Sequence, residues 1–474
     1  MAYTVVQSPE NWVQGSKYPI IYVVYDDTNP GSASVFKYKY ICDIYVGGSK
    51  VARLKTLPNS NDRGVFQVNR ILDDYVTPTA ANVNSVNNGL NLDGVITLGV
   101  EETAKPFGKN TEATRRVEFK FGYEYATSAT SAPTIYEDQI TGNYVSVIKA
   151  HGYFGVSETL ADQFEDSDLK RFQLDSSLDP FISAVPRVSG SASIISSSFR
   201  YDQDVHLNQA HVLSFLNDET SSTQPRGPNN IFVAGYEADG TEIFNSYIAN
   251  LTANGGEAPG TSNSDDERLL YFGAGPLNLT SQTNNSTISV GMADADLAYY
   301  EVVACDTTTL SAINQVSAVY RFNIVSECKY ETRRVMFQNQ YGGWDFLNFE
   351  KRSERKLNFE RSEYYRPLGN WDTAQPSAED WGYTNYAQGR STLMTRTTLK
   401  ETLNTDWLPE HFNPFFEALL ASPKVYVIEQ NQGIDAYQIP AVITNTDHVR
   451  KTGINDSLIT YSIEVEYSRP LHLG

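Results

Sequence analysis

The sequence predicts a mainly β fold, in which multidomain β-sandwich-like modules precede an α+β C-terminal domain. The chain contains 30 Tyr and 22 Phe but only 4 Met and 3 Cys, and aromatic and β-branched residues favour half-buried pleated surfaces. In addition, runs of alternating apolar and polar residues recur at intervals of about 8–12 residues, separated by Gly, Asn and Pro. That spacing is typical of sandwich domains.

The length of the chain indicates several domains. At 474 residues it has room for roughly three domains of about 100–200 residues each. We expect a β-sandwich-like domain over 1–130, a connecting region over 131–200, a second β-rich domain over 201–328 and an α+β domain over 329–474. A Ser/Ala/Thr-rich stretch at 126–134 marks the first boundary. The two β-rich domains share a rhythm without a residue-level repeat, which leaves a diverged duplication open.

A Gly-Gly hairpin is the clearest element of the first domain. Phe36–Val46 alternates between polar and apolar residues and ends at a Gly-Gly pair, and Val51–Lys55 forms the return strand. Gly supplies the positive φ that a two-residue hairpin turn requires. The other expected elements are an N-terminal segment (Met1–Tyr18), strands at Tyr18–Tyr25, Gly64–Val68 and Val117–Tyr125, one helical turn within Asn69–Val76 and a polar loop at 77–95.

The middle of the chain repeats this β pattern. Its expected strands are Ala210–Phe215, Asn230–Tyr236, Leu269–Gly273, Tyr299–Ala304 and Val319–Val325. The acidic stretch Glu158–Asp166 predicts a short helix in the connecting region. Thr252–Glu267 is rich in Gly, Asn, Ser and Asp, which predicts an exposed loop.

The last domain opens with a second Gly-Gly hairpin and contains one helix. In Arg333–Phe349, two strand-like runs flank Gly342 and Gly343. We expect the helix to begin at Asp406 as its cap, with Pro409 in its first turn. The apolar stripe of this helix consists of Phe415, Phe416, Leu419 and Leu420, and we expect the helix to end at Ser422-Pro423. Three strands are expected after it, at Lys424–Ile428, Tyr437–Thr444 and Leu458–Tyr467.

Charge and cysteine content exclude several classes of protein. The net charge of −20 argues against nucleic-acid binding, because neutralising phosphates requires a basic surface. Cys42, Cys305 and Cys328 are too far apart for a disulfide framework or a zinc site, and we expect synthesis in a reducing bacterial cytoplasm. The start of the chain has no signal-peptide pattern, and no apolar run reaches the about 18–20 residues of a membrane-spanning helix. We therefore expect no membrane partner.

No motif predicts catalysis, a cofactor or a metal, so we do not expect an enzyme. The chain lacks nucleophile-elbow, phosphate-loop and dinucleotide-binding patterns. His206 and His211 are five residues apart without a ligand motif, and we expect ordinary histidines at strand ends. Two Asp-x-Asp pairs, at 202–204 and 294–296, do not continue into a calcium loop, and turn capping is the preferred interpretation.

Parts of the chain resemble a known group of proteins. Arg334–Asp345 has an apolar residue and Asn followed by Gly-Gly, an aromatic residue and Asp. The resemblance also includes Glu401–Leu408, Phe415–Leu420, Ser422–Tyr426, Tyr461–Tyr467 and the block Pro19–Val76. Together these segments are similar to virion structural (neck or tail) proteins of tailed phages infecting Bacteroidota, of the crAss-like phage type. The resemblance covers about half the chain, residues 18–76 and 330–474, and implies a β-rich oligomer in the virion with no catalytic residues.

We therefore expect a phage virion structural protein, in a neck, collar, ring or tail. Its partners would be copies of itself, as a homo-oligomeric ring, and neighbouring virion proteins. We predict that three segments lie at subunit interfaces: the hairpin tip Tyr341–Phe349, the segment Met1–Tyr18 and the loop Thr252–Glu267. Within the first two, the predicted interface residues are Tyr341, Gly342, Gly343, Trp344, Phe346 and Tyr18. The alternative is a carbohydrate-binding or depolymerising receptor-binding protein, in which Tyr364, Tyr365, Trp371 and Trp381 stack on sugars.

Overall fold

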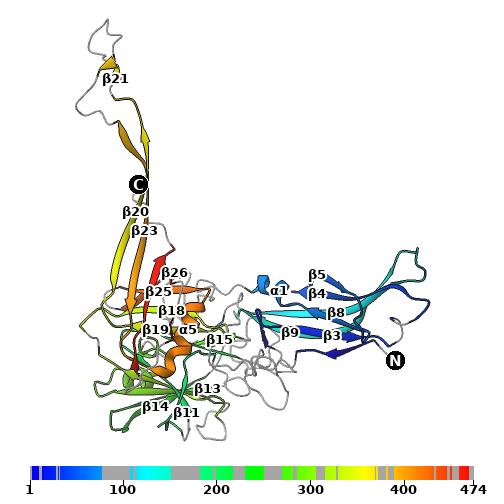
Figure 1. The fold of residues 1–474 in the computed structure, drawn as a ribbon. Coiled ribbons are helices and arrows are strands. Elements are labelled where there is room, and N and C mark those ends of the chain that lie inside the picture. Colours follow the sequence, from blue (N-terminus) through cyan, green and yellow to red (C-terminus); the bar gives the residue numbers. More distant parts are fainter. Residues whose placement is uncertain are drawn as a thin grey trace.

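The computed structural model shows a mainly β, multidomain chain with short helices, as predicted. It describes residues 3–9, 13–27, 30, 32–76, 107–109, 114–150, 182–195, 199–216, 230–249, 269–280, 285–305, 315–326, 329–368, 370–371, 381–382, 389–431, 434–445, 449–450 and 458–468. An N-terminal sandwich extends to one side of a larger body, and a long two-stranded ribbon rises from that body (Figure 1). The expected helix Glu158–Asp166 and the loops 77–95 and Thr252–Glu267 lie outside the described residues.

The N-terminal unit is sandwich-like, as predicted. Its sheets have the strand orders β1-β3-β6 and β2-β9-β8-β4-β5. The bounds are β1 Thr4–Gln7, β2 Val13–Gly15, β3 Ile21–Tyr25, β4 Phe36–Val46, β5 Ser49–Thr56, β6 Arg63–Gln67, β8 Thr114–Ala126 and β9 Thr134–Ile148, with helix α1 at Asn69–Leu72 and a 3-10 turn at Asp73–Tyr75. Tyr22 from one sheet packs against Phe119 and Phe121 from the other, with ring centroids 4.7 and 5.3 Å apart. This aromatic contact between the sheets forms the centre of a separate hydrophobic core.

The Gly-Gly hairpin of this unit forms as predicted, but the sheet extends further along the chain than expected. Gly47 and Gly48 have φ of 57° and 76° and join β4 to β5. The stretch 126–134, predicted as a domain boundary, is the turn between β8 and β9, which pair antiparallel. Polar side chains suit an exposed hairpin turn as well as a linker. The predicted boundary at residue 130 therefore falls within a hairpin.

The body begins with a six-stranded sheet of order β10-β11-β17-β16-β13-β14 and a three-stranded sheet of order β12-β15-β7. The bounds are β7 Phe107–Lys109, β10 Arg187–Ser189, β11 Phe199–Val205, β12 Val212–Leu216, β13 Asn230–Tyr236, β14 Glu242–Ala249, β15 Leu269–Gly273, β16 Tyr299–Cys305 and β17 Val319–Ile324, with helices α3 Pro276–Thr280 and α4 Ser286–Gly291. The five strands predicted for this part are confirmed. β11 and β17 pair in parallel, so this sheet is mixed.

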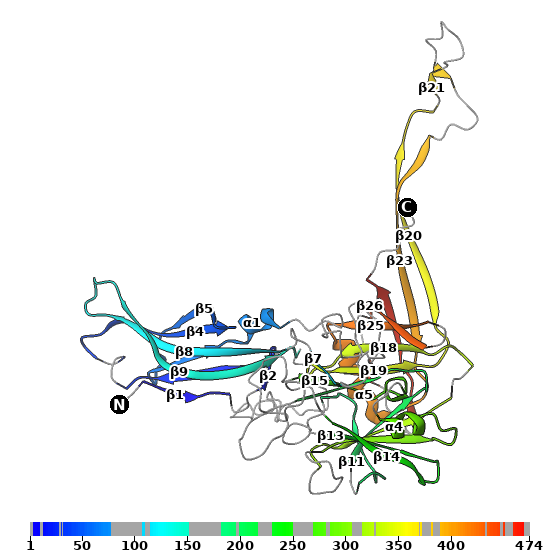
Figure 2. The same ribbon diagram turned by 180° about the vertical axis from the view of Figure 1, so that it is seen from behind.

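A seven-stranded sheet, of order β19-β18-β25-β26-β28-β23-β20, completes the body (Figure 2). The bounds are β18 Arg333–Gln338, β19 Trp344–Phe349, β20 Glu354–Tyr365, β23 Arg390–Asn404, β25 Val425–Asn431, β26 Ile434–Ile443 and β28 Ser462–Tyr467. Two short pairs, β21 Asn370–Trp371 with β22 Trp381–Gly382 and β24 Leu408–Pro409 with β27 Leu458–Ile459, and helix α5 Asn413–Ala421 accompany it. One hydrophobic core joins this sheet to the six-stranded sheet, and includes Phe322 from β17, Phe337 from β18 and Phe415 from α5. The predicted second β-rich domain and the C-terminal domain therefore share a core.

Two predictions in this region are wrong. Helix α5 begins at Asn413, not at Asp406, after a 3-10 turn at Glu410–Phe412. Pro409 is extended, with φ −59° and ψ 144°, because Leu408–Pro409 pairs with β27. The same pairing divides the predicted ten-residue strand Leu458–Tyr467 into β27 and β28. The predicted helix end is confirmed, since Ser422 is the C-cap.

Candidate interaction site

The predicted interface residues at the β18–β19 turn pack inside this chain. Trp344 and Phe346 are 1% and 0% exposed, in a cluster with Ile148 of the sandwich and Tyr271 of β15. Gly342 and Gly343 are buried as well, and Gly342 has φ 94°. Of the six predicted residues, Tyr341 has the most exposed side chain, at 36%. Contact of these residues with another subunit stays a prediction.

A network of buried polar groups fixes this turn. Asn339 Oδ1 accepts hydrogen bonds from the backbone N–H groups of Tyr341 and Gly343, both at 3.0 Å. Its Nδ2 donates to Asp345 Oδ2 at 2.8 Å. Asp345 also accepts from Ser183 Oγ and from the backbone N–H of Ala184, each at 2.7 Å. Burial raises the pKa of Asp345 to about 6, against the opposing effect of these hydrogen bonds.

The sandwich meets the body at the same turn. Gln338 Nε2 donates to the carbonyl oxygen of Lys149 at 3.1 Å, and the Tyr18 hydroxyl donates to the carbonyl of Gln340 at 3.4 Å. A Cβ on Gly342 would lie 2.5 Å from the Lys149 carbonyl oxygen, so the close approach of the two backbones requires glycine. The structure thus brings Tyr18 and the Gly-Gly turn together, and it does so through contacts within one chain.

The strand pair β20–β23 extends far beyond the sheet that holds its base. β28 pairs with β23 only from Lys400 to Asn404. From Arg390 to Leu399, β23 pairs with β20 alone among the described residues, and β20 is the edge strand of the sheet. We call residues 354–368 and 389–400 the ribbon; it rises from the body in both Figure 1 and Figure 2. The alternating residues of its strands point to two opposite faces.

The two faces of the ribbon have different chemistry. On one face, Leu357 lies opposite Leu399, and Phe359 lies opposite Thr397. On the other face, Lys356 lies opposite Lys400, and Glu360 lies opposite Arg396. The apolar face is continuous with the side of the seven-stranded sheet that covers the hydrophobic core, where Leu403 pairs with Ile463.

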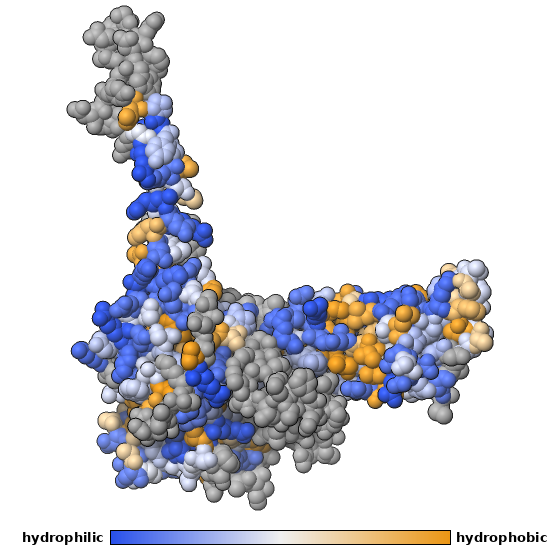
Figure 3. Space-filling model, in the orientation of Figure 1, coloured by the Kyte–Doolittle hydropathy of each residue, from blue (hydrophilic) through white to orange (hydrophobic). Residues whose placement is uncertain are grey.

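The apolar side chains of the ribbon are exposed to solvent. Leu357 and Phe359 are each 46% exposed, and Leu393 and Met394, at a β-bulge, are 70% and 59% exposed. Tyr365, further along, is 76% exposed. Figure 3 shows apolar residues along the ribbon among hydrophilic ones, and a larger apolar area on the N-terminal sandwich. Sustained apolar exposure on a projecting element is typical of a contact surface.

The ribbon is basic in an acidic protein. It carries seven Lys or Arg (Arg355, Lys356, Arg361, Arg366, Arg390, Arg396 and Lys400) against three Glu (Glu354, Glu360 and Glu363). Residues 151–330 carry 8 Lys or Arg against 23 Asp or Glu. Charge of opposite sign is thus separated along the chain, with the positive excess on the exposed ribbon.

A buried ion cluster anchors the base of the ribbon. The Glu401 side chain is fully buried, and its Oε1 is 2.9 Å from Arg333 Nε and 3.2 Å from Arg355 Nε. The Tyr467 hydroxyl donates to the same carboxylate, and Arg355 also pairs with Glu429 at 2.6 Å. Since these residues come from β18, β20, β23, β25 and β28, the cluster ties the root of the ribbon to the sheet.

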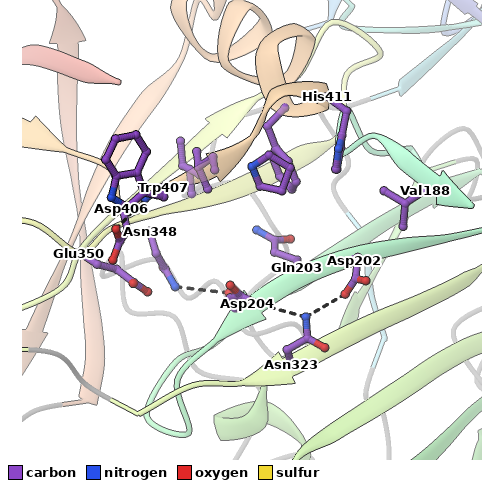
Figure 4. Close-up of a pocket in the computed structure, with 14 residues that line it drawn as sticks. Val188, Asp202, Gln203, Asp204, Asn323, Asn348, Glu350, Asp406, Trp407 and His411 are labelled. Carbon is purple, nitrogen blue, oxygen red and sulfur yellow. Dashed lines mark hydrogen bonds between the residues drawn. The ribbon is translucent and has the colours of Figure 1, made fainter. Parts of the chain in front are cut away.

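A pocket of about 260 Å³ opens between the six-stranded sheet and the start of the α5 region (Figure 4). Asp202, Asp204, Glu350 and Asp406 supply carboxylates to its lining, and Trp407 and His411 supply rings. Turn capping was the wrong interpretation for Asp202 and Asp204, which lie on strand β11, where both accept from Asn323 Nδ2, at 2.8 and 3.0 Å. For Asp294 the interpretation as a turn cap is confirmed, because Asp294 Oδ1 accepts a hydrogen bond from the backbone N–H of Asp296 at 2.9 Å.

His206 and His211 lie at strand ends, as predicted. His206 follows β11 and His211 precedes β12, and both are buried. His211 Nδ1 is 3.0 Å from an Arg334 guanidinium nitrogen, and burial together with that cation holds the pKa of His211 well below its usual range. Within the described ranges, no group of three His, Cys, Asp or Glu side chains has the arrangement of a metal site. His151, His448 and His472 lie outside those ranges.

Among the helices that the structure describes, none is long and apolar enough to cross a membrane. A scan of the sequence against protein-family models and a search of curated proteins gave no match.

Proposed function

We propose that this chain is a structural protein of a tailed-phage virion, which assembles as a homo-oligomer in a neck, collar, ring or tail. One observation carries the proposal: the ribbon projects from the body with exposed Leu357 and Phe359 on one face. A two-stranded hairpin is at best marginally stable in water, and covering its apolar face by a neighbour would stabilise it. The resemblance of residues 18–76 and 330–474 to virion proteins supports the proposed location.

The geometry of the chain suits a cyclic assembly. A ribbon that contacts a different surface of the next copy makes a heterologous contact. Such contacts close into a ring when the rotation between neighbours permits it. Rigid sheets anchored by the Glu401 cluster would hold the ribbon at a fixed angle for that contact.

Analysis of purified particles tests the proposed location. Particles of the phage that encodes the chain should contain it in several copies, measured by quantitative mass spectrometry. A label fused after Gly474 should appear at the neck or along the tail in electron micrographs. Absence of the chain from purified particles, while it is abundant in infected cells, would overturn the proposal.

Glycan binding is the second candidate, and the far end of the ribbon favours it. Trp371 is the register partner of Trp381 in the β21–β22 pair, and Tyr364 and Tyr365 are 41% and 76% exposed. Exposed tyrosine rings such as these two are suited to stacking on sugar rings. Binding of the isolated chain to a glycan array, or loss of turbidity of capsular polysaccharide, would support this function. Loss of binding in Tyr365→Ala, with binding retained in the Tyr247→Ala control, would place it on the ribbon.

A further inference from the structure

We propose that the ribbon of one copy docks over the acidic pocket of a second copy, through both its apolar face and its positive charge. This inference rests on the proposed function, because it names the partner and the surface for the same assembly. The pocket is the one described above, lined by Asp202, Asp204, Glu350, Asp406 and Trp407 among others.

Charge identifies a second copy of this chain as the occupant. The ribbon has four more Lys and Arg than Glu, and two of these, Arg355 and Lys400, pair with carboxylates of the sheet at its base, which leaves an excess of two positive charges on the rest of the ribbon. Residues 151–330 have an excess of 15 negative charges. Two ribbons would repel one another, so ribbon-to-ribbon pairing is disfavoured. A ribbon and an acidic body attract, which favours the contact and speeds association.

The pocket keeps a negative excess after its internal ion pairs. Asp202 pairs with Arg200 at 3.0 Å, Asp406 pairs with Lys351 at 2.7 Å, and Glu350 Oε1 lies 3.3 Å from His206 Nε2. Asp204 accepts instead from the neutral amide of Asn323. Desolvation by the surrounding atoms, together with Glu350 and Asp202, raises the pKa of Asp204 against the opposing effect of the Asn323 hydrogen bond. A cationic side chain at this point would relieve the repulsion between the carboxylates.

Apolar side chains lie next to the carboxylates of the pocket. On the ribbon, an apolar side chain likewise lies next to an arginine. Trp407 is 61% exposed beside the pocket, and Leu408 and Phe412 line it. On the ribbon, the Arg361 guanidinium lies 5.6 Å from the centre of the Phe359 ring. Arg361 is therefore placed next to an apolar side chain, and the exposed Trp407 ring would accept such a cation on its face.

The contact must be between copies. In Figure 1 and Figure 2 the ribbon rises away from β11, which carries Asp202 and Asp204. Each copy thus contacts one neighbour through its ribbon and a second neighbour through its pocket. Such a contact propagates until the ring closes.

Cross-linking between isotopically heavy and light copies of the full chain locates the contact. A carbodiimide activates a carboxylate, and the amine introduced by Arg361→Lys, on the same face as Phe359, then forms an amide as the urea leaves, so only groups in contact are joined. We expect heavy–light links from position 361 to Asp202, Asp204 or Glu350. An oligomer whose heavy–light links from position 361 all lie on the N-terminal sandwich or on another ribbon would overturn the inference.

Paired variants test the contact independently. Phe359→Ser with Arg361→Glu alters the ribbon, and Asp204→Asn with Trp407→Ala alters the pocket. All four side chains are exposed, so the fold should be retained, which circular dichroism checks. Each variant alone should associate at least about tenfold more weakly than the unaltered chain. The matched control is Val65→Ser with Arg63→Glu, an equally exposed pair at the same spacing on β6.

Mixing the two variants gives the most specific result. Each mixed pair retains one intact ribbon and one intact pocket, so the mixture should form a two-chain complex and nothing larger. An unaltered chain that remains a monomer would overturn the proposed function and this inference together. An unaltered oligomer that persists in the ribbon variant, or a mixture that forms no pair, would overturn this inference alone.

Discussion

Leu357 and Leu399 lie directly opposite one another across β20 and β23, one residue beyond the point where β28 stops pairing with β23. Leu399 still packs against the hydrophobic core, whereas Leu357 is 46% exposed. The apolar face of the sheet therefore continues past the edge of the body into solvent. This pair marks the beginning of the surface that we assign to assembly.

Substitution of Leu357 should separate assembly from folding. Leu357→Ser removes an exposed apolar side chain, so the free energy of unfolding of the isolated chain should fall by less than about 1 kcal/mol. The mass of the oligomer, measured by sedimentation velocity, should fall at the same time. Val65→Ser is the control, because Val65 is also 46% exposed but lies on the sandwich. Equal loss of assembly in both variants would contradict the assignment.

Glu401→Gln should be far more costly to the fold. The substitution leaves Arg333 buried with a weaker partner, and breaking a buried ion pair costs about 3–5 kcal/mol. Chemical denaturation measures the change in the free energy of unfolding. Glu464→Gln is the control, since its exposed pair with Lys400 should contribute about 1 kcal/mol or less. A small change in Glu401→Gln would show that the cluster does not anchor the ribbon.

Alanine at Gly342 should weaken the junction between the sandwich and the body. Gly342 and Gly47 both have positive φ, 94° and 57°, so alanine at either site costs about 1–2 kcal/mol of backbone strain. Only at Gly342 would the new Cβ meet backbone, at 2.5 Å from the Lys149 carbonyl oxygen. Thermal unfolding should therefore show a larger loss for Gly342→Ala than for Gly47→Ala. Equal losses would mean that the turn does not hold the sandwich.

The burial of Asp345 predicts a pH dependence of stability. Its pKa of about 6 in the folded chain lies above the usual value of 3.8 for an aspartate, so the folded state binds more protons between these values. The free energy of unfolding should then fall as pH rises from about 4 to above 6, by about 3 kcal/mol from this group. The difference in stability between the unaltered chain and Asp345→Asn isolates the effect. A difference that stays constant from pH 4 to pH 7 would contradict it.

Local patterns predicted much of the fold. The Gly47-Gly48 pair and the alternation in Phe36–Val46 were sufficient to predict the first hairpin, and the structure gives both glycines the positive φ that its turn requires. The start of α5 was missed because Leu408–Pro409 pairs with Leu458–Ile459, about 50 residues away along the chain. Pairing between residues so far apart along the chain cannot be predicted from a short stretch of sequence. The polar turn at 126–134 was misread as a linker for the same reason, since turns and linkers share composition.

The site was less predictable than the fold. The structure packs Trp344 and Phe346 inside the chain, and aromatic alternation alone does not distinguish such packing from a subunit interface. Their contact with another subunit stays a prediction. The ribbon was not predicted at all, although the alternation of Leu357, Phe359 and Arg361 with polar residues was available as a signal. Whether a strand face is covered depends on the neighbouring strands. Here the pairing of β28 with β23 ends at Lys400, and the apolar face of the ribbon beyond that point is exposed.

The mass of the purified chain in solution tests the central claim most directly. We predict that mass photometry will show complexes at one whole-number multiple of 52.9 kDa, and that the multiple will fall to one in the ribbon variant Phe359→Ser with Arg361→Glu. A single species of 52.9 kDa at every protein concentration measured would contradict the account.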